Sequence, residues 1–145
     1  MERKEFSIVI DASKEKVWNI LWNDHTYSQW TSAFCEGSKA ETDWAKGSKV
    51  RFLGPDGGGM VSVISEKITG EFMSFEHRGV VIGGIEDYNS ETAKEWQGSL
   101  EYYRLVQMDE KTELFVDMDI AQSHKDYFLT TWPKALEKVK ELAEE

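Results

Sequence analysis

The sequence predicts an α+β fold in which an open antiparallel sheet is covered by one long helix. Three observations support this prediction. One strand-like segment and two short helical segments open the chain, residues 36–122 are almost entirely strand-like, and residues 123–145 have a helical pattern. An antiparallel sheet with one apolar face must bury that face, and a single long amphipathic helix can cover it.

The first strand and the first helix are marked by a change of period. Apolar residues at every second position from Phe6 to Ile10 predict a strand. In the next stretch, DASKEKVWNILWND, Val17, Ile20 and Leu21 fall on one face of a helix. Ser13 precedes that helix, and its hydroxyl can accept a hydrogen bond from a backbone N–H group of the first turn.

Turn residues divide the middle of the chain into strands. Residues 25–34 are predicted to form a second short helix or an irregular turn. Turns rich in Gly, Asp, Asn or Glu-Lys then separate strand-like segments at 36–42, 48–54, 60–69, 71–82, 95–107 and 111–121. In the last of them, apolar residues alternate with a set that includes Glu113, Asp117 and Asp119, so we expect these acids to point to solvent.

The C-terminal segment predicts the covering helix. Ser123 and Asp126 form an S-x-x-D helix-start signal. Apolar residues follow at spacings of three and four, at Phe128, Trp132, Leu136, Val139 and Leu142. Pro133 lies within this pattern; it cannot donate a hydrogen bond to the Leu129 carbonyl, and its ring crowds that carbonyl. We therefore expect a kink or a break between Leu129 and Trp132.

A glycine-rich stretch, FLGPDGGGMVSVI at residues 52–64, raises the question of a phosphate-binding loop. Such a loop requires Gly-Lys-Ser/Thr leading into a helix whose N-terminus helps to hold the phosphate. No such tripeptide follows here, and residues 60–64 are strand-like. The order Gly-Pro-Asp-Gly at 54–57 is typical of a tight turn, and the additional glycines permit a bulge. The stretch is therefore interpreted as a β-hairpin.

The composition indicates a soluble globular protein with a single domain, residues 1–145. The chain carries 17 Lys and Arg against 27 Asp and Glu, a formal net charge of −10. Nucleic acids attract basic surfaces, so we expect no nucleic acid partner. No apolar run is long enough to span a bilayer, and we expect no membrane insertion. The single cysteine excludes an internal disulfide, and the charged N-terminus is unlike a signal peptide, so we expect a cytoplasmic location.

Several stretches, taken in order, resemble one known family. They are EKVWNILWND, YSQWTSAF, GSKVRFLGPDGGGMVSVI, EWQGSLEYYRLVQMDEKTELFVDMDI and TTWPKALEKVKELAEE. In the order and spacing of these stretches the chain is similar, over nearly its whole length, to the SRPBCC or START-like superfamily. The similarity is to the branch of the activator of heat-shock protein 90 ATPase. Where many relatives carry prolines before the first helix, this chain has Ala12-Ser13-Lys14.

The resemblance implies the helix-grip fold, a curved antiparallel sheet of six to seven strands around a long C-terminal helix, with two short helices after the first strand. It also implies a class of function. We favour the non-catalytic binding of a small apolar or amphipathic molecule between the sheet and the long helix. The alternatives are a cyclase- or aromatase-like enzyme and a module that interacts with a chaperone ATPase. The oligomeric state is left open.

Aromatic residues supply the candidates for a ligand cavity. The chain has six tryptophans, and a curved sheet with one helix can leave a hollow lined by rings and methyl groups. The alternative is a closed core that the same rings fill. Arg51 and Arg104 are candidate anchors for an anionic head group, unless strand alternation places them outside. The predicted ligand-binding residues are Trp30, Phe52, Met60, Phe75, His77, Trp96, Tyr102, Phe128 and Trp132.

His77 is the candidate acid–base group of such a cavity. It shares a strand face with Met73 and Phe75, and it points inward if that face is concave. In the other register, Phe72 and Val80 face inward and His77 is exposed.

No other pattern points to catalysis or to a cofactor. The three histidines lack metal-ligand spacing, so we expect no metal site. There is no G-x-S-x-G motif, and Cys35 is expected to be a buried or edge residue without a catalytic role. We therefore predict no catalytic residue and no cofactor. The long connection GVVIGGIEDYNSETAKEW is either the rim of a binding site or a solvated hairpin tip.

Overall fold

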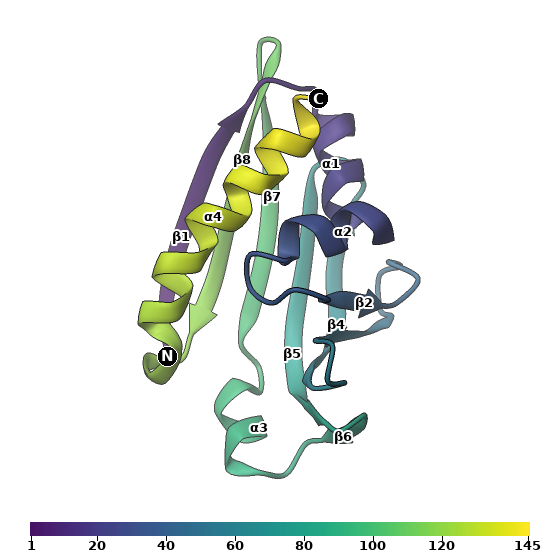
Figure 1. The fold of residues 1–145 in the computed structure, drawn as a ribbon, viewed down its shortest axis with the longest axis vertical. Helices are drawn as coiled ribbons and strands as arrows, with labels where there is room; N and C mark the ends of the chain where they lie inside the picture. Colours follow the sequence, from purple (N-terminus) through teal and green to yellow (C-terminus); the bar gives the residue numbers. More distant parts are fainter.

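A computed structural model describes all of residues 1–145 and contains one antiparallel sheet of eight strands (Figure 1). The strand order is β1-β8-β7-β5-β4-β3-β2, and the short β6 pairs with β5 at one end. The strands are β1 (Glu2–Ile10), β2 (Lys39–Glu41), β3 (Lys49–Leu53), β4 (Gly59–Ile68), β5 (Phe72–Ile82), β6 (Ile85–Asp87), β7 (Leu100–Met108) and β8 (Lys111–Ile120). The α+β prediction is confirmed, with β6 as a strand beyond the expected number.

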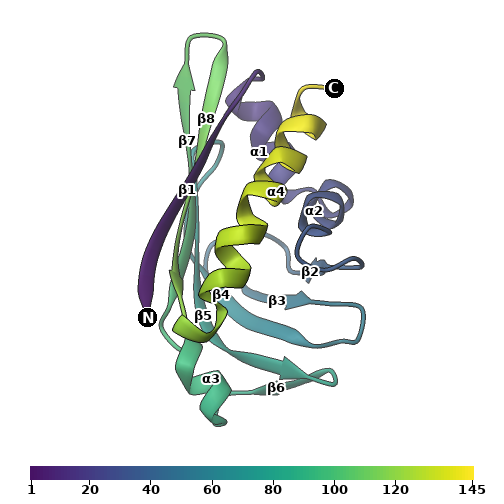
Figure 2. The same ribbon diagram turned by 60° about the vertical axis from the view of Figure 1, so that its left-hand side comes forward.

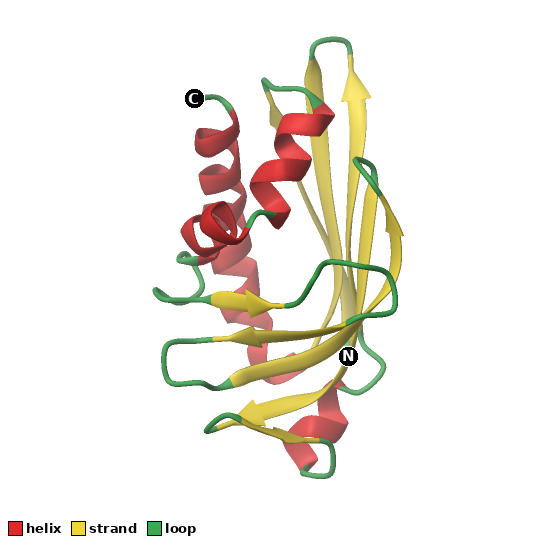
Figure 3. Cartoon of the chain, turned by 90° about the vertical axis from the view of Figure 1, so that its right-hand side faces the viewer, coloured by secondary structure: helices red, strands yellow, loops and turns green.

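The four helices are α1 (Lys14–Trp22), α2 (Asp24–Thr31), α3 (Glu91–Trp96) and α4 (Lys125–Ala143), with a 3-10 turn at Gln122–His124 before α4. Three of the four helices, α1, α2 and α4, lie on the concave face of this sheet, and α3 lies at its end near β6 (Figure 1). The long α4 crosses in front of the sheet, and α1 and α2 lie beside it (Figure 2). The strands curve toward the helices, so that β2 and β3 run below α2 (Figure 3).

Side-chain caps explain the two short helices that follow β1. The Ser13 hydroxyl accepts a hydrogen bond from the backbone N–H of Lys16 at 3.2 Å, as expected from the sequence. Asn23 ends α1 and begins α2, since its side chain accepts from the backbone N–H of His25 at 3.0 Å. Residues 25–34 therefore form a helix followed by a turn, and the prediction of a second short helix is confirmed.

The glycine-rich stretch forms the β3–β4 hairpin, as predicted. Gly54 and Gly58 are joined across the turn, because the Gly54 N–H donates to the Gly58 carbonyl at 2.8 Å. The side chain of Asp56 accepts from the Gly58 N–H at 2.9 Å. Gly59 has to be glycine, since a Cβ there would stand 1.7 Å from the Phe52 carbonyl oxygen.

Two register shifts in the pairing of β4 with β5 bend both strands. One lies between Val61 and Ser62, and after it Ser62 stands opposite His77. The close approach of β6 at this bend requires Gly79, because a Cβ there would be 2.5 Å from the Asp87 carbonyl oxygen. The bend therefore sets which residues of β4 and β5 face one another below the helices.

The strand predicted at 95–107 begins later than expected. Ser90 starts the helix α3 by accepting a hydrogen bond from the Ala93 N–H at 3.1 Å, and β7 begins only at Leu100. The connection between β5 and β7 also contains β6. Sequence reasoning missed this Ser-Glu-Thr-Ala start signal because the helix is too short to show an amphipathic period.

The C-terminal helix differs from its prediction in two ways. It is continuous through Pro133, so of the two expected alternatives, a kink or a break, the break does not occur. Pro133 is exposed and so is Leu129, which leaves the Leu129 carbonyl on the solvent side where water can satisfy it. Ser123 does not cap the helix; its hydroxyl contacts Glu95 at 3.3 Å and His124 at 2.9 Å, and α4 starts after the 3-10 turn.

Acidic side chains on the outer face of the sheet are paired or buried. Asp119 pairs with Arg3 at 2.8 Å, and Asp117 is buried with only 8% exposed. The expectation that Asp117 and Asp119 point to solvent is therefore corrected, since Arg3 of β1 pairs with Asp119 and Glu5 of β1 stands opposite Asp117. The core lies on the other face, where 22 buried residues from the sheet and the helices form one cluster. None of the helices combines the length and the apolar composition of a membrane-spanning segment.

Candidate functional site

A cavity of about 580 Å³ lies between the helices and the curved sheet. Its walls come from α2 and the loop after it, from the β3–β4 hairpin, from β7 and from the first half of α4. Eleven of its 19 lining residues are hydrophobic. The aromatic lining residues are Tyr27, Trp30, Phe34, Phe52, Tyr103, Tyr127, Phe128 and Trp132.

Five of the nine predicted ligand-binding residues line this cavity. They are Trp30, Phe52, Met60, Phe128 and Trp132. The two tryptophans keep their indole N–H groups inside the protein: that of Trp30 donates to the Leu21 carbonyl at 3.2 Å, and that of Trp132 points to the Met118 sulfur at 2.8 Å. These rings therefore present apolar surface to the cavity.

Three other predicted residues form the layer behind the cavity wall. Phe75 is fully buried and packs edge-on against Phe52, with ring centroids 5.1 Å apart. His77 is buried between Phe52 and Trp96, whose rings lie 6.4 and 6.5 Å away. Trp96 packs against Phe128 at 6.2 Å. These three residues support the lining and do not belong to it.

The structure places Tyr102 on the opposite face of the sheet, which corrects the prediction that it lines the cavity. Its ring packs against Phe72, and its hydroxyl accepts a hydrogen bond from Arg3 at 3.0 Å. The neighbouring Tyr103 points inward and lines the cavity. In a strand, successive side chains point to opposite faces, so an error of one residue in β7 exchanges the two tyrosines.

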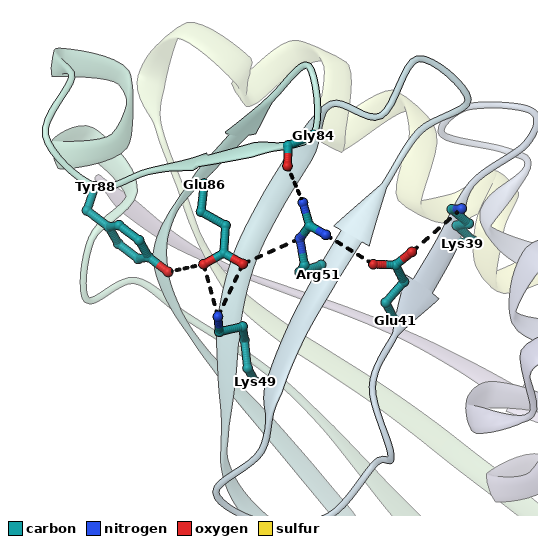
Figure 4. Close-up of polar contacts among 7 residues, drawn as sticks. All are labelled: Lys39, Glu41, Lys49, Arg51, Gly84, Glu86 and Tyr88. Carbon is teal, nitrogen blue, oxygen red and sulfur yellow. Dashed lines mark hydrogen bonds and ion pairs between the residues drawn. The ribbon is translucent and has the colours of Figure 1, made fainter.

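Both predicted arginine anchors also lie outside the cavity. Arg51 lies in a network with Glu41 at 3.3 Å, Glu86 at 3.5 Å and the Gly84 carbonyl at 2.7 Å (Figure 4). Arg104 stacks on the ring of Phe115 on the outer face, 4.3 Å from its centroid. No arginine is therefore present in the cavity to hold an anionic head group.

A chain of polar side chains reaches the cavity wall from behind. The Ser62 hydroxyl lies 2.6 Å from Nδ1 of His77, and Nε2 of His77 lies 3.3 Å from Oε1 of Glu101. The Tyr103 hydroxyl donates to Oε2 of Glu101. Because a carboxylate can only accept, His77 presents its Nε2–H to Glu101, and its Nδ1 can accept the Ser62 proton. Ser62 and His77 are almost completely buried, whereas Glu101 lines the cavity.

The charge of Glu101 acts on the two phenols that line the same cavity. Burial, followed by the charge of Glu101, raises the pKa of Tyr103 well above its usual range. The same two causes, in the same order, raise the pKa of Tyr27. Both tyrosines therefore remain neutral hydroxyls that can donate hydrogen bonds near the carboxylate.

The rim of the cavity contains residues that were expected to serve only as a turn or as a structural cysteine. Gly54, Asp56 and Gly58 of the β3–β4 hairpin line it, so the hairpin forms one lip of the opening. Cys35 also lies at the rim and is exposed, which corrects the expectation of a buried or edge cysteine. Lys39 lies there as well, 3.7 Å from Glu41.

Sequence reasoning missed three residues that determine the character of the cavity: Tyr27, Glu101 and Tyr103. An available signal was the pair Glu101 and Tyr103, two residues apart on one face of a strand. The unused lone pairs of Glu101 can accept a hydrogen bond from a guest or pair with a cation. Nowhere in the structure are three or more His, Cys, Asp or Glu side chains grouped so that they could hold a metal ion.

The fold is shared with solved structures of several bacterial proteins. The Aha1 dimer from Colwellia psychrerythraea superposes with a TM-score of 0.76 at 18% identity, over 99% of this chain and 97% of that one. CalU16 from Micromonospora echinospora gives 0.69 at 13% identity, over 97% of this chain and 75% of that one. DynU16, from the dynemicin biosynthetic locus, gives 0.72 at 14% identity, over 97% of this chain and 46% of that one.

These likenesses show the helix-grip fold that the sequence resemblance implied. No protein-family model matches the chain, and no curated protein is similar to it in sequence. At identities below one fifth, shared architecture does not carry the activity of one protein to another. The function therefore has to be argued from the cavity.

Proposed function

We propose that this helix-grip protein binds a small apolar or amphipathic molecule in the cavity between the sheet and α4, without catalysing a reaction on it. The observation that carries the proposal is the cavity itself, about 580 Å³ with a mainly hydrophobic lining. Pockets for small molecules have volumes of roughly 300–1,000 Å³ and combine apolar walls with a few polar groups.

The packing around the cavity supports a preformed site. Trp132 is held between α2 and the sheet, with Phe34, Tyr103 and Trp30 at centroid distances of 4.9, 6.0 and 6.2 Å. Rings fixed from several sides lose little freedom when a guest arrives, and this favours binding. The fold neighbours CalU16 and DynU16 are compatible with the proposal at the level of architecture.

A titration followed by NMR tests this function. We expect at least one of four ligand classes, fatty acids, sterols, aromatic polyketides and apolar amines, to shift the resonances of lining residues saturably, with Tyr27, Phe52 and Trp132 as reporters. Met60→Trp inserts a larger side chain into the lining and should weaken binding at least about tenfold, since the indole ring would occupy part of the cavity volume that the guest needs. Met108→Trp makes the same exchange at an exposed site in β7 and should leave the affinity unchanged.

Two results would contradict the proposal. One is the absence of saturable shifts at lining residues across all four ligand classes. The other is equal weakening by both tryptophan variants, because the cavity would then not be the place of binding.

A further inference from the structure

The charged groups of the cavity differ in how they are neutralised. Three charged residues line it: Lys39, Asp56 and Glu101. Asp56 is engaged in the hairpin turn, where it accepts the N–H of Gly58, and the Lys39 side chain is 58% exposed near Glu41. Glu101 is different, since only 17% of its side chain is exposed and it belongs to the inner wall.

Glu101 has no permanently charged partner in the protein. Its two oxygens contact His77, which is charged only when protonated, and the neutral hydroxyl of Tyr103. No lysine or arginine forms an ion pair with it. Removing a carboxylate from water without a nearby cation costs free energy. The lone pairs of Glu101 that are not used within the protein can accept hydrogen bonds from a guest.

The aromatic rings that line the same cavity as Glu101 favour a positive charge. Tyr103, Trp30 and Trp132 lie within 6.0–6.4 Å of one another, centroid to centroid, and all line the cavity. The negative faces of such rings attract ammonium groups within about 6 Å. The net charge of −10 attracts cations from solution in addition.

We infer that the guest of this cavity is an apolar amine, whose ammonium group pairs with Glu101 while its hydrocarbon or aromatic body occupies the ring-lined space. This inference rests on the proposed binding function and specifies its ligand class. Carboxylates such as fatty acids are disfavoured, because Arg51 and Arg104 lie outside and Glu101 repels an anion.

Three probes of nearly equal size test the inference: phenylbutylammonium, phenylbutanol and phenylbutanoate. Their affinities are measured by NMR titration of the native protein and of two variants. In the native protein we expect the ammonium to bind at least about tenfold more tightly than the alcohol, a difference of about 1.4 kcal/mol, and the carboxylate to bind most weakly. Glu101→Gln should remove this preference and retain binding of the alcohol. Glu137→Gln removes one charge from the exposed side of α4 and should retain the preference.

A second measurement does not depend on how the Glu101 variant folds. Intermolecular NOEs in the native protein should place the methylene group next to the ammonium close to the side chains of Glu101 and Tyr103. The inverted pose, with the phenyl ring at Glu101, would overturn the inference.

The outcomes separate the two proposals. Equal binding of the ammonium and the alcohol, or a preference that survives in Glu101→Gln, overturns the amine inference and leaves the binding function intact. Failure of all three probes to shift any lining residue, together with failure of the wider panel, overturns the binding function and the amine inference with it.

Discussion

At the scale of single residues, the polarity of the cavity depends on where one register shift falls. The shift after Val61 brings Ser62 opposite His77, and their side chains meet at 2.6 Å. Held by Ser62, the His77 ring presents its other nitrogen to Glu101 at 3.3 Å. A buried polar side chain is stable only when it is hydrogen-bonded, so this arrangement lets His77 occupy an aromatic core. Two strands of the sheet thereby hold the carboxylate that faces the cavity.

A first prediction at this scale concerns the hairpin that forms the cavity lip. Gly59→Ala should lower the free energy of unfolding by about 2–3 kcal/mol, because its Cβ would collide with the Phe52 carbonyl oxygen and force β3 and β4 apart. Gly54→Ala is the matched control: the nearest heavy atom to its Cβ is 3.5 Å away, so a change within about 0.5 kcal/mol is expected. Urea unfolding of both variants measures the difference. Equal stabilities would show that the hairpin tolerates a side chain at either glycine.

At the scale of elements, two hairpin tips support one another beside the cavity opening. Arg51 of β3 joins Glu41 of β2, Glu86 of β6 and the Gly84 carbonyl, and Lys49 approaches Glu86 at 3.1 Å (Figure 4). The Gly84 N–H donates to the Gly57 carbonyl at 3.2 Å. The long connection between β5 and β7 is therefore tied to the cavity lip at its β5–β6 turn.

Removing this network should loosen the β5–β6 turn more than it destabilises the protein. In Arg51→Met, hydrogen exchange at the Gly84 amide should rise at least about threefold, while global stability falls by no more than about 1 kcal/mol, the upper value for ion pairs near the surface. Lys49→Met removes only the contact with Glu86 and should have a smaller effect on that amide. Amide exchange measured by NMR gives both values. An unchanged Gly84 rate in Arg51→Met would mean that the network does not hold the turn.

The proline inside α4 provides a second prediction at this scale. Pro133→Ala should raise the free energy of unfolding by up to about 3 kcal/mol, because alanine restores an N–H donor to Leu129 and removes the ring. The larger entropy of the unfolded alanine chain reduces this gain by up to about 1 kcal/mol. Lys134→Ala, at the next exposed position, should change stability by less than about 0.5 kcal/mol. A thermal melt in which the proline variant is no more stable than the lysine variant would contradict the expectation.

At the scale of the whole molecule, helices cover one face of the sheet and charged side chains cover part of the other. On the outer face Asp117 stands opposite Glu5 in the sheet, which places like charges side by side. Burial first, and then the charge of Glu5, raises the pKa of Asp117 above its ordinary value of 3.8. Burial alone would raise the pKa of Asp119 as well. Hydrogen bonds from Arg3 and from the Leu100 N–H outweigh burial, so the pKa of Asp119 is lowered.

These opposite shifts predict opposite effects of two neighbouring substitutions. The raised pKa of Asp117 means that protonation favours folding below pH 3.8 and that this contribution is lost as the pH rises through the folded-state pKa. The lowered pKa of Asp119 means that its contribution is present above pH 3.8 and is lost as the pH falls. At neutral pH, Asp117→Asn should therefore stabilise the protein by up to about 1 kcal/mol, and Asp119→Asn should destabilise it by about 1 kcal/mol.

Urea unfolding at neutral pH and below pH 3.8 measures both effects. The stability difference that each variant shows at neutral pH should be smaller below pH 3.8, because the aspartate of the native protein is then protonated and has lost the charge that Asn also lacks. The same sign for the two variants at neutral pH would contradict this account of the outer face.

How far the site could be predicted is clearest in β5 and β7. The alternation of Met73, Phe75 and His77 indicated a shared face, and all three are buried as that pattern requires. In β7 the sequence contains two adjacent tyrosines, and alternation alone does not tell which of Tyr102 and Tyr103 faces inward. Because the prediction placed Tyr102 in the cavity, it also missed Glu101, which lies on the same face of β7 as Tyr103.

The sequence by itself determined the order of the helices and strands other than β6 and α3, the β3–β4 hairpin at the glycine loop and the long helix that covers the sheet. These features depend on local properties: the period of apolar residues, the conformational freedom of glycine and the capping of helix ends. Only the tertiary structure decided which strand faces meet, where β4 and β5 shift register, and that a hollow with a carboxylate on its wall remains beneath α4. Those outcomes depend on contacts between residues far apart in the chain, because packing distances and strand register are set by partners that no local pattern specifies.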